Sequence, residues 1–243
     1  MAYAYTRAPE ERPKLGLIAL QADRTMEDDF RRLMPADVSL LVSRVPSGLE
    51  VTSESLAEME GHLSASAALF PEGHGFDVIG YGCTSATAQI GAERVADQVR
   101  KGAETAHVTD PVTALIAACA AAQARRIAIL SPYVASVSDR LRDVLATAGI
   151  DTPTFGSFDE ANEAAVAGID AASITGATLD MMQGANVDAV FLSCTNLRTL
   201  DVIGPLQARL GVPVLSSNLV LAWHMLHLAW QGPGQPGGLL GLK

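Results

Sequence analysis

The sequence predicts an α/β protein with two pseudosymmetric lobes, each a four-stranded parallel sheet flanked by helices, and an active site between them. Short apolar runs alternate with longer amphipathic segments along all 243 residues. The short runs are apolar throughout, which indicates strands buried on both faces, as in a parallel sheet covered by helices. A segment around Cys83 also recurs around Cys194, about half the chain further on. Alternation and duplication together predict the two lobes.

The first copy is expected to hold four strands. The apolar run that follows Lys14 predicts the first strand. The helix after it opens with Glu27, Asp28 and Asp29, and acidic residues suit the positive end of a helix. We expect strands at residues 15–20, 38–42, 77–81 and 107–109, and helices at 25–34, 53–69 and 88–101.

The second copy repeats this order. Residues 126–131 resemble the first strand of the first copy, and residues 212–216 resemble its fourth strand. We expect strands at residues 127–130, 154–157, 189–193 and 212–215, and helices at 112–123, 135–148, 171–183, 200–210 and 219–230.

The predicted boundaries follow from these elements. Residues 1–13 form a flexible arm, 14–111 the first lobe and 112–216 the second lobe. Residues 217–230 form a C-terminal helix that packs back on the first lobe. Residues 231–243 are rich in Gly and Pro, which predicts a flexible tail.

Composition narrows the class of protein. With 49% hydrophobic residues the chain can bury a full core, and its formal charge of −10 argues against nucleic-acid binding. No uncharged apolar run is long enough to cross a membrane, and residues 1–14 lack the apolar stretch of a secretory signal. Three cysteines without close spacing do not make a disulfide framework. We expect a cytoplasmic homo-oligomer.

The duplicated segment carries the functional prediction. In each copy an Asp opens an apolar run, a small residue follows, and Cys-Thr comes next. The small residue is expected to let the chain turn sharply. Cys83 and Cys194 then lie at the carboxyl ends of buried strands, just before a helix, where ligands of open parallel sheets bind.

A cysteine at a helix N-terminus sees exposed N–H groups, which favour an anion and are expected to lower the thiol pKa. The N–H groups and side chains of Thr84, Ser85, Thr195 and Asn196 can bind a substrate carboxylate. We therefore expect a small carboxylic or amino acid to be held between two thiols, without a metal or an organic cofactor.

Two facing thiols have several uses. They can racemise an acid by moving a proton from one face to the other. One thiolate can add to a double bond and leave after rotation, or one thiol can return a proton after decarboxylation. A two-lobed binding protein is the non-enzymatic alternative. Cys119 lies within an apolar helix and is expected in the core, and His224 with His227 lack a third metal ligand.

Four ordered motifs resemble the maleate isomerase and arylmalonate decarboxylase group of the Asp/Glu racemase superfamily. They run through residues 82–85, 131–133, 193–198 and 213–218, with Trp223. The resemblance implies two α/β lobes, no cofactor, Cys83 as nucleophile and Cys194 as its proton-transfer partner. Arylmalonate decarboxylases keep only the second cysteine, so the presence of both disfavours decarboxylation.

The resemblance also implies roles for three other residues. Tyr133 matches a family Tyr and is expected to hydrogen-bond a carboxylate or a developing enolate. Asn162 lies within one residue of a substrate-holding Asn. Asp23 replaces a family Asn, and a carboxylate there would repel a dicarboxylate but pair with an ammonium group. Asp23 and residues 44–52 resemble the ectoine-utilisation branch, which implies an amino-acid-like substrate; maleate isomerisation is the alternative.

Overall fold

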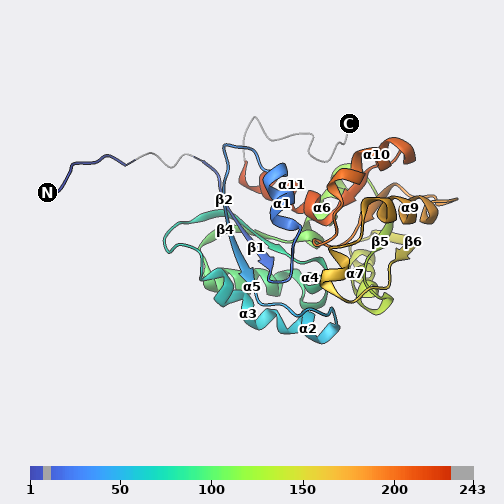
Figure 1. The fold of residues 1–243 in the computed structure, drawn as a ribbon, viewed down its shortest axis with the longest axis horizontal. Coiled ribbons are helices and arrows are strands. Elements are labelled where there is room, and N and C mark those ends of the chain that lie inside the picture. Colours follow the sequence, from blue (N-terminus) through green and yellow to red (C-terminus); the bar gives the residue numbers. More distant parts are fainter. Residues whose placement is uncertain (8–11, 231–243) are drawn as a thin grey trace.

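The computed structural model describes residues 1–7 and 12–230. Residues 1–7 extend away from the body of the molecule (Figure 1). The predicted tail at residues 231–243 lies outside the described residues, as does part of the predicted arm. Within the described residues, no helix has both the length and the apolar character needed to cross a membrane.

The first lobe is built on a parallel sheet of order β2-β1-β3-β4. Apolar side chains of α2, α3 and α5 cover one face of this sheet. Helices α1 and α11 cover the other face, as Figure 1 shows. The strands are β1 (Lys14–Leu20), β2 (Ser39–Val45), β3 (Phe76–Gly82) and β4 (Thr105–Thr109), and the helices before β4 are α1 (Met26–Leu33), α2 (Ser53–Glu58), α3 (Glu60–Ala67), α4 (Thr84–Ile90) and α5 (Ala92–Gly102).

The second lobe repeats that order as β6-β5-β7-β8, again all parallel. Helices α6 and α7 cover one face and α9 and α10 the other. The strands are β5 (Arg126–Ser131), β6 (Asp151–Ser157), β7 (Ala189–Leu192) and β8 (Val214–Ser216), and the helices are α6 (Pro111–Ala122), α7 (Ala135–Thr147), α8 (Glu163–Val166), α9 (Ala171–Met181), α10 (Leu200–Leu210) and α11 (Ser217–Ala229). The predicted fold class and all eight strands are confirmed.

The duplicated Asp has the same structural task in both lobes. Asp77 Oδ2 accepts a hydrogen bond from the backbone N–H of Lys14 at 2.8 Å. Asp188 Oδ2 accepts from the N–H groups of Arg125 and Arg126 at 2.8 and 2.9 Å. In each case the carboxylate ties the start of the cysteine-bearing strand to the start of the lobe's first strand, which aligns β3 with β1 and β7 with β5.

The last helix of each half packs on the other half. Helix α6 follows β4 of the first lobe, yet Leu115 and Ala118 pack with Ile127 and Ile129 of β5. Helix α11 follows β8 of the second lobe, yet Leu221 and Met225 pack in the cluster that contains β1 and β3 residues. The two helices also contact each other. Each sheet is therefore covered in part by the helix that follows the last strand of the other lobe.

Three helical segments differ from the prediction. The helix expected at 53–69 is two helices that meet at Met59. The helix expected at 88–101 begins earlier, at Thr84, and breaks at Gly91, whose φ of 99° lies in the region that glycine tolerates best. The short helix α8 was not expected. The spacing of apolar residues continues through the breaks at Met59 and Gly91, so it predicts a single helix where the chain forms two.

Candidate active site

Cys83 stands at the end of β3 and caps α4. Its Sγ accepts a hydrogen bond from the backbone N–H of Ala86 at 3.3 Å. The residue before it, Gly82, is the last residue of β3 and does not have a positive φ, so the expectation that it permits a sharp turn is wrong. Gly82 is needed for space instead, because a Cβ atom there would overlap the sulfur of Met26. A larger residue here would force the Met26 side chain of α1 to move, so glycine allows the close approach of α1 to the end of β3.

Cys194 stands at the end of β7 with a different backbone. Its φ is +104°, a backbone conformation that residues other than glycine rarely adopt. The next helix, α10, starts only at Leu200, so the prediction that a helix follows directly holds for Cys83 and is wrong for Cys194. The turn is fixed by two hydrogen bonds. Cys194 N–H donates to Ser217 Oγ at 2.9 Å, and Asn196 N–H donates to Cys194 Sγ at 3.3 Å.

Burial dominates the acidity of both thiols. It raises the pKa of Cys83 from 9.0 to about 12, although hydrogen bonds from Ala86 and Ser85 oppose the rise. It also raises the pKa of Cys194 well above its ordinary value. The negative charges of Glu163 and Asp23 add to the rise at both sulfurs. The expected lowering of the thiol pKa is therefore wrong, since desolvation outweighs the helix N-terminus.

Tyr133, which follows β5, contacts Cys194, which follows the neighbouring strand β7. Tyr133 is buried, and its backbone N–H donates to Ser131 Oγ at 3.2 Å. The Tyr133 hydroxyl lies 3.0 Å from Cys194 Sγ and donates to Glu163 Oε1 at 2.8 Å. A tyrosine hydroxyl carries one proton, so when that proton is donated to an ionised Glu163, the thiol is the donor in the contact with Cys194.

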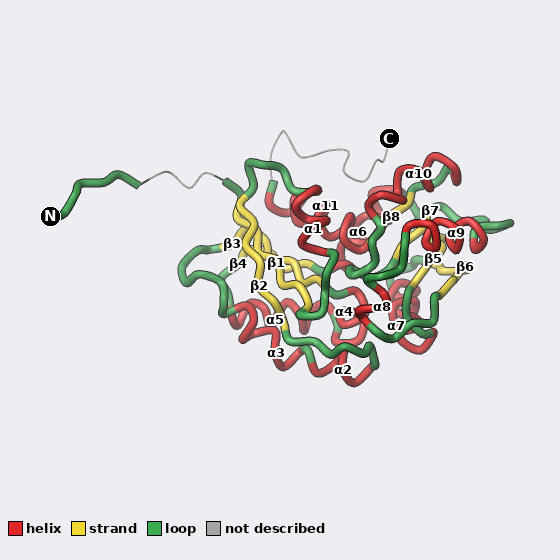
Figure 2. The backbone as a smooth tube through the Cα atoms, in the orientation of Figure 1, coloured by secondary structure: helices red, strands yellow, loops and turns green. Residues whose placement is uncertain are grey.

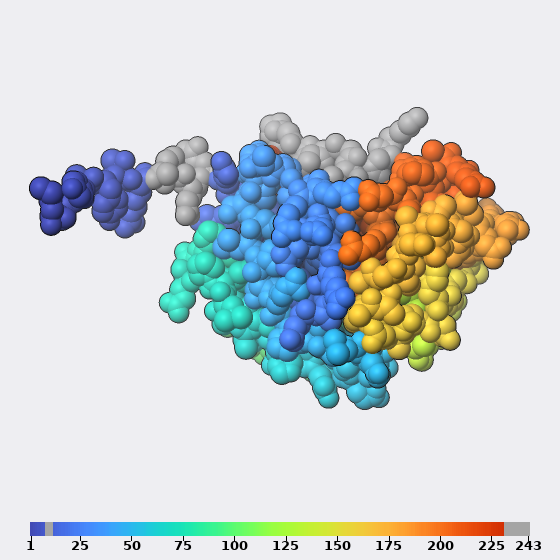
Figure 3. All heavy atoms as spheres, in the orientation of Figure 1, coloured from blue at the N-terminus to red at the C-terminus, as the bar shows by residue number. Residues whose placement is uncertain are grey.

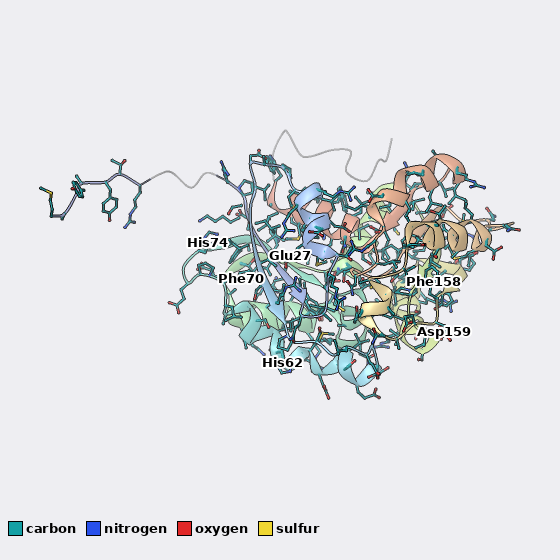
Figure 4. All side chains as sticks on the ribbon, in the orientation of Figure 1. Glu27, His62, Phe70, His74, Phe158 and Asp159 are labelled. Carbon is teal, nitrogen blue, oxygen red and sulfur yellow. The ribbon has the colours of Figure 1, made fainter. Side chains whose placement is uncertain are left out.

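Glu163 is a buried carboxylate that the sequence prediction missed. It begins α8 at the junction of the lobes (Figure 2) and is 3% exposed. Its backbone N–H donates to Leu49 O at 3.0 Å, so the first lobe holds it in place. Asn196 Nδ2 donates to its Oε2 at 2.7 Å and to its carbonyl oxygen at 3.0 Å. The loop before it includes Phe158 and Asp159, labelled on the second lobe in Figure 4.

Asn162 and Asn196 hold the backbone around this carboxylate. The exposed Asn162 caps α8, and its Oδ1 accepts from the N–H groups of Ala164 and Ala165 at 3.0 and 3.1 Å. Asn196 is buried, and its Oδ1 accepts from Arg24 N–H at 2.9 Å. With its Nδ2 on Glu163, the Asn196 amide is fully engaged within the protein.

The hydroxyls predicted to bind substrate also have protein partners. Thr84 Oγ1 lies 2.8 Å from Ser217 Oγ, and Thr195 Oγ1 donates to Gly82 O at 3.2 Å. Ser85 is half-buried. The N–H groups of Thr84 and Ser85 belong to the first turn of α4, which has no helical acceptors for them. The Ser85 N–H already contributes a hydrogen bond to Cys83, so the Thr84 N–H is the one of the two better able to donate to a substrate carboxylate.

Asp23 presents a buried oxygen to the site. Its Oδ1 accepts from the N–H groups of Thr25 and Met26, both at 2.8 Å, but its Oδ2 has no hydrogen-bond partner within the described residues. The hydroxyl of Thr195 is a neighbour that lowers the pKa of Asp23, while its proton goes to Gly82. Burial prevails and raises the pKa of Asp23 from 3.8 to about 6, and the charge of Glu163 adds to this.

Asp29 is a third buried carboxylate, next to the start of α11. Asn218 Nδ2 donates to Asp29 Oδ2 and to Thr195 O, both at 2.8 Å. Burial raises the pKa of Asp29 to about 6. The bond from Asn218 couples the start of α11 to α1 of the first lobe and to the turn after Cys194. On the face shown in Figure 3, the residues of the two lobes meet along a continuous seam.

The described residues contain no group of three or more His, Cys, Asp and Glu side chains that could hold a metal ion. His224 Nδ1 lies 2.7 Å from Thr109 Oγ1, and burial lowers the His224 pKa to about 4. Cys119 is 1% exposed within the core of the second lobe, as predicted.

Known proteins resemble this chain over nearly its whole length. Arylmalonate decarboxylase from Bordetella bronchiseptica is 28% identical over 233 residues, which cover 93% of this chain and 94% of that protein. A maleate isomerase from Pseudomonas putida S16, solved with maleate, matches with a TM-score of 0.84 at 26% identity, covering 96% and 98% of the two chains. A maleate cis-trans isomerase from Nocardia farcinica, solved with a covalently bound succinylcysteine intermediate, shares the fold with a TM-score of 0.76 at 22% identity, covering 89% and 92%.

A family model also matches the chain. It is described as arylmalonate decarboxylase and covers residues 105–238, more than half of the sequence. That range contains α6, the whole second lobe and α11, together with Tyr133, Glu163 and Cys194. The chain therefore belongs to the arylmalonate decarboxylase family, in the group of the Asp/Glu racemase superfamily that also contains the maleate isomerases.

Proposed function

We propose that this protein is a cofactor-independent isomerase or racemase that acts on a small carboxylic acid through Cys83 and Cys194. The observation that carries the proposal is the equivalence of the two thiols. Each stands at the end of the third strand of its lobe, and each accepts a backbone hydrogen bond at 3.3 Å. Both are also influenced by the charges of Asp23 and Glu163. Two thiols in one polar, buried neighbourhood suit transfer of a proton across a substrate carbon.

For a racemase, one thiolate takes the α-proton and the carbon retains the electron pair as an enolate. The opposite thiol then gives its proton to the other face of that carbon. For a cis-trans isomerase, the thiolate of Cys83 adds to the double bond, the carbon–carbon bond rotates, and elimination restores the double bond and the thiolate. Both routes need thiolates in a site where burial opposes them, so the substrate's own charge matters.

We favour an amino-acid-like substrate because of Asp23. Its Oδ2 is buried without a hydrogen-bond partner in the described part of the chain, and a buried carboxylate oxygen requires one. A substrate ammonium group would supply both the hydrogen bond and the opposite charge. The N–H group of Thr84, at the start of α4, would donate a hydrogen bond to the carboxylate of the same substrate. This arrangement also agrees with the ectoine-related role inferred from the sequence.

Maleate isomerisation is the second candidate, and the similarity to the Pseudomonas enzyme favours it. The two carboxylates of maleate would have to approach Asp23 and Glu163, which costs free energy by like-charge repulsion. Decarboxylation is the third candidate, favoured by the relative from Bordetella. It requires one proton-donating thiol and leaves Cys83 without a task.

The test is an assay of the purified protein in deuterated water. Small chiral α-amino acids and N-acyl amino acids, maleate and an arylmalonate would be supplied in separate reactions. Deuterium incorporation at Cα with loss of optical activity would support racemisation. Conversion of maleate to fumarate at a higher kcat/KM would replace the amino-acid preference with the isomerase alternative. Carbon dioxide release from the arylmalonate alone would overturn the proposal, as would absence of reaction with every substrate.

A further inference from the structure

The two thiols differ in what lies behind them. Cys194 is hydrogen-bonded to Tyr133, and Tyr133 to Glu163, so two hydrogen bonds separate a thiol from a buried carboxylate. Cys83 accepts a bond from Ala86 N–H, and its aromatic neighbour is Tyr81, whose hydroxyl lies 3.7 Å from the sulfur of Met59. Tyr81 also interacts with Cys83, and its carboxylate neighbour Asp110 accepts from Val112 and Thr113 rather than from Tyr81. Among the described residues, a carboxylate therefore accepts from the tyrosine next to the cysteine in the second lobe and not in the first.

With Glu163 ionised and Cys194 a neutral thiol, the number of protons fixes the direction of these hydrogen bonds. Glu163 Oε2 accepts from Asn196, which leaves Oε1 to accept the Tyr133 proton. The Tyr133 oxygen then accepts the proton of the Cys194 thiol at 3.0 Å. Each donor in the series points toward Glu163, so the chain of protons is already oriented from sulfur to carboxylate.

We propose that Glu163 is the internal proton acceptor for Cys194, with Tyr133 carrying the proton between them. The Cys194 S–H bond breaks as an O–H bond forms at Tyr133. The original Tyr133 O–H bond breaks as an O–H bond forms at Glu163 Oε1. The result is a Cys194 thiolate and a neutral Glu163 carboxyl, with no change in net charge and no oxidation or reduction.

Conservation of charge is the physical advantage of this route. Loss of the Cys194 proton to water would create another buried anion beside Glu163. Burial and the charge of Glu163 oppose this, and both raise the pKa of Cys194 well above its ordinary value. Transfer within the series instead moves one existing negative charge from oxygen to sulfur. The Asn196 N–H, which donates to Cys194 Sγ, then stabilises the negative charge on the sulfur. The reverse transfer makes Cys194 a proton donor again, as alternating acid and base steps require.

The geometry of Glu163 fits this role better than a role in holding substrate. Both carboxylate oxygens are engaged by protein donors, at 2.7 and 2.8 Å. Its position is fixed from both lobes, by Leu49 O on one side and Asn196 on the other. It acts through Tyr133 and is a positioning residue for the Cys194 proton. The inference rests on the proposed function, in which Cys194 gives and takes a proton.

The test measures the thiol directly, without a substrate. Replacing Cys83 and Cys119 by Ser leaves Cys194 as the one cysteine of the chain. Its rate of alkylation by iodoacetamide is followed by mass spectrometry from about pH 6 to about pH 8. Asp23 also acts on Cys194 by its charge, and its pKa of about 6 lies at the lower limit of this range, so the rates above about pH 7 are compared. With an internal acceptor, the rate there is nearly independent of pH, because the thiol proton goes to Glu163 rather than to water.

Glu163→Gln and Tyr133→Phe in the same background should both lose the pH-independent rate. Their rates should rise about tenfold for each pH unit, as for a thiol that ionises to solvent. Glu160→Gln is the matched control, since Glu160 lies in the same loop and its Oε1 accepts only from Ala161 and Asn162 N–H groups. This variant should keep the profile of the single-cysteine parent.

A pH-independent rate that survives in Glu163→Gln would overturn the proposal, and so would a parent rate that already rises tenfold per pH unit. Circular dichroism and thermal unfolding of each variant would show that the fold is retained, and Tyr133→Phe tests the same series at a second atom. The deuterium-exchange assay of the unsubstituted protein reports separately on the proposed function. Loss of the proton series and loss of the function are therefore distinguishable.

Discussion

The hydroxyl oxygens of Thr84 and Ser217 lie 2.8 Å apart, although the two residues belong to different halves of the chain. Ser217 Oγ also accepts the backbone N–H of Cys194 at 2.9 Å. One buried serine at the start of α11 therefore connects the turn after Cys83 with the turn at Cys194. The backbone next to each thiol is thus tied to the same hydroxyl group.

Replacing Ser217 by Ala should affect both stability and turnover. The buried N–H of Cys194 would lose its acceptor, which costs about 1–3 kcal/mol of folding free energy. Turnover should fall further than stability predicts, because Cys194 holds a φ of +104° that this bond helps to maintain. Urea unfolding and the deuterium-exchange assay measure the two effects. The exposed Ser53→Ala is the control, and equal behaviour of the two variants would contradict the prediction.

Replacing Cys83 or Cys194 by Ala should lower kcat by about a hundredfold to ten-thousandfold, the usual contribution of a general acid or base. Serine at either position should do little better, since a hydroxyl is far less acidic than a thiol. Cys119→Ala should retain turnover, because Cys119 lies in the core of the second lobe. Steady-state kinetics on the three alanine variants would decide. A Cys119 variant as inactive as the others would refute the assignment.

Replacing Asp23 by Asn separates the candidate substrates. An ammonium-bearing substrate should bind more weakly by about 1.5–3 kcal/mol, the usual contribution of a hydrogen bond to a charged group. Maleate should bind better, because a like charge is removed. Isothermal titration and KM values on both substrates give the comparison, with Asp28→Asn as a control on the exposed side of α1. Unchanged affinity for every amino-acid substrate would rule out Asp23 as the ammonium partner.

The same variant should change how stability depends on pH. Burial raises the pKa of Asp23 from 3.8 to about 6, so the folded protein holds this proton more tightly than the unfolded chain. Stability therefore falls as pH rises from about 4 to about 6, by roughly 3 kcal/mol for this group. Asp23→Asn has no such proton to lose.

The free energy of unfolding of Asp23→Asn, relative to the unsubstituted protein, should increase over that pH range and stay constant above it. Denaturant unfolding between about pH 4 and about pH 8 measures it. Asp29, whose pKa is also raised to about 6, remains in both proteins, but the charge of Asp23 contributes to that rise, so removing Asp23 also lowers the pKa of Asp29 and adds to the difference in the same direction. A difference that does not vary with pH would show that Asp23 is not the group responsible.

The sequence predicts the strands well because each is a short apolar run with a fixed place in a repeated order. The cysteines follow from the same repeat. Glu163 did not emerge, since it lies in an irregular segment where nothing distinguishes a buried carboxylate from the exposed ones around it. Its burial depends on Leu49 and Asn196, which are distant in the sequence and meet it only in the folded chain.

The duplication also predicted too much similarity between the two turns. Cys83 follows the expected strand-to-helix geometry, whereas Cys194 adopts a positive φ and has no helix directly after it. Identical Cys-Thr letters do not encode this difference. It arises because Gly82 is packed against Met26 in one lobe, while Ser217 and Asn196 shape the other. The thiol pKa was predicted with the wrong sign for a related reason, since burial cannot be read from a local motif.

The exchange of α6 and α11 between lobes has a consequence for synthesis of the protein. Until residues 217–229 leave the ribosome, the apolar side chains of Leu15, Leu17 and Val78 lack part of their cover, because Leu221 and Met225 complete that cluster. The first lobe is thus completed by a segment that is translated only after all four strands of the second lobe. A chain that stops before α11 would expose the apolar face of the first sheet, and an exposed apolar surface promotes aggregation.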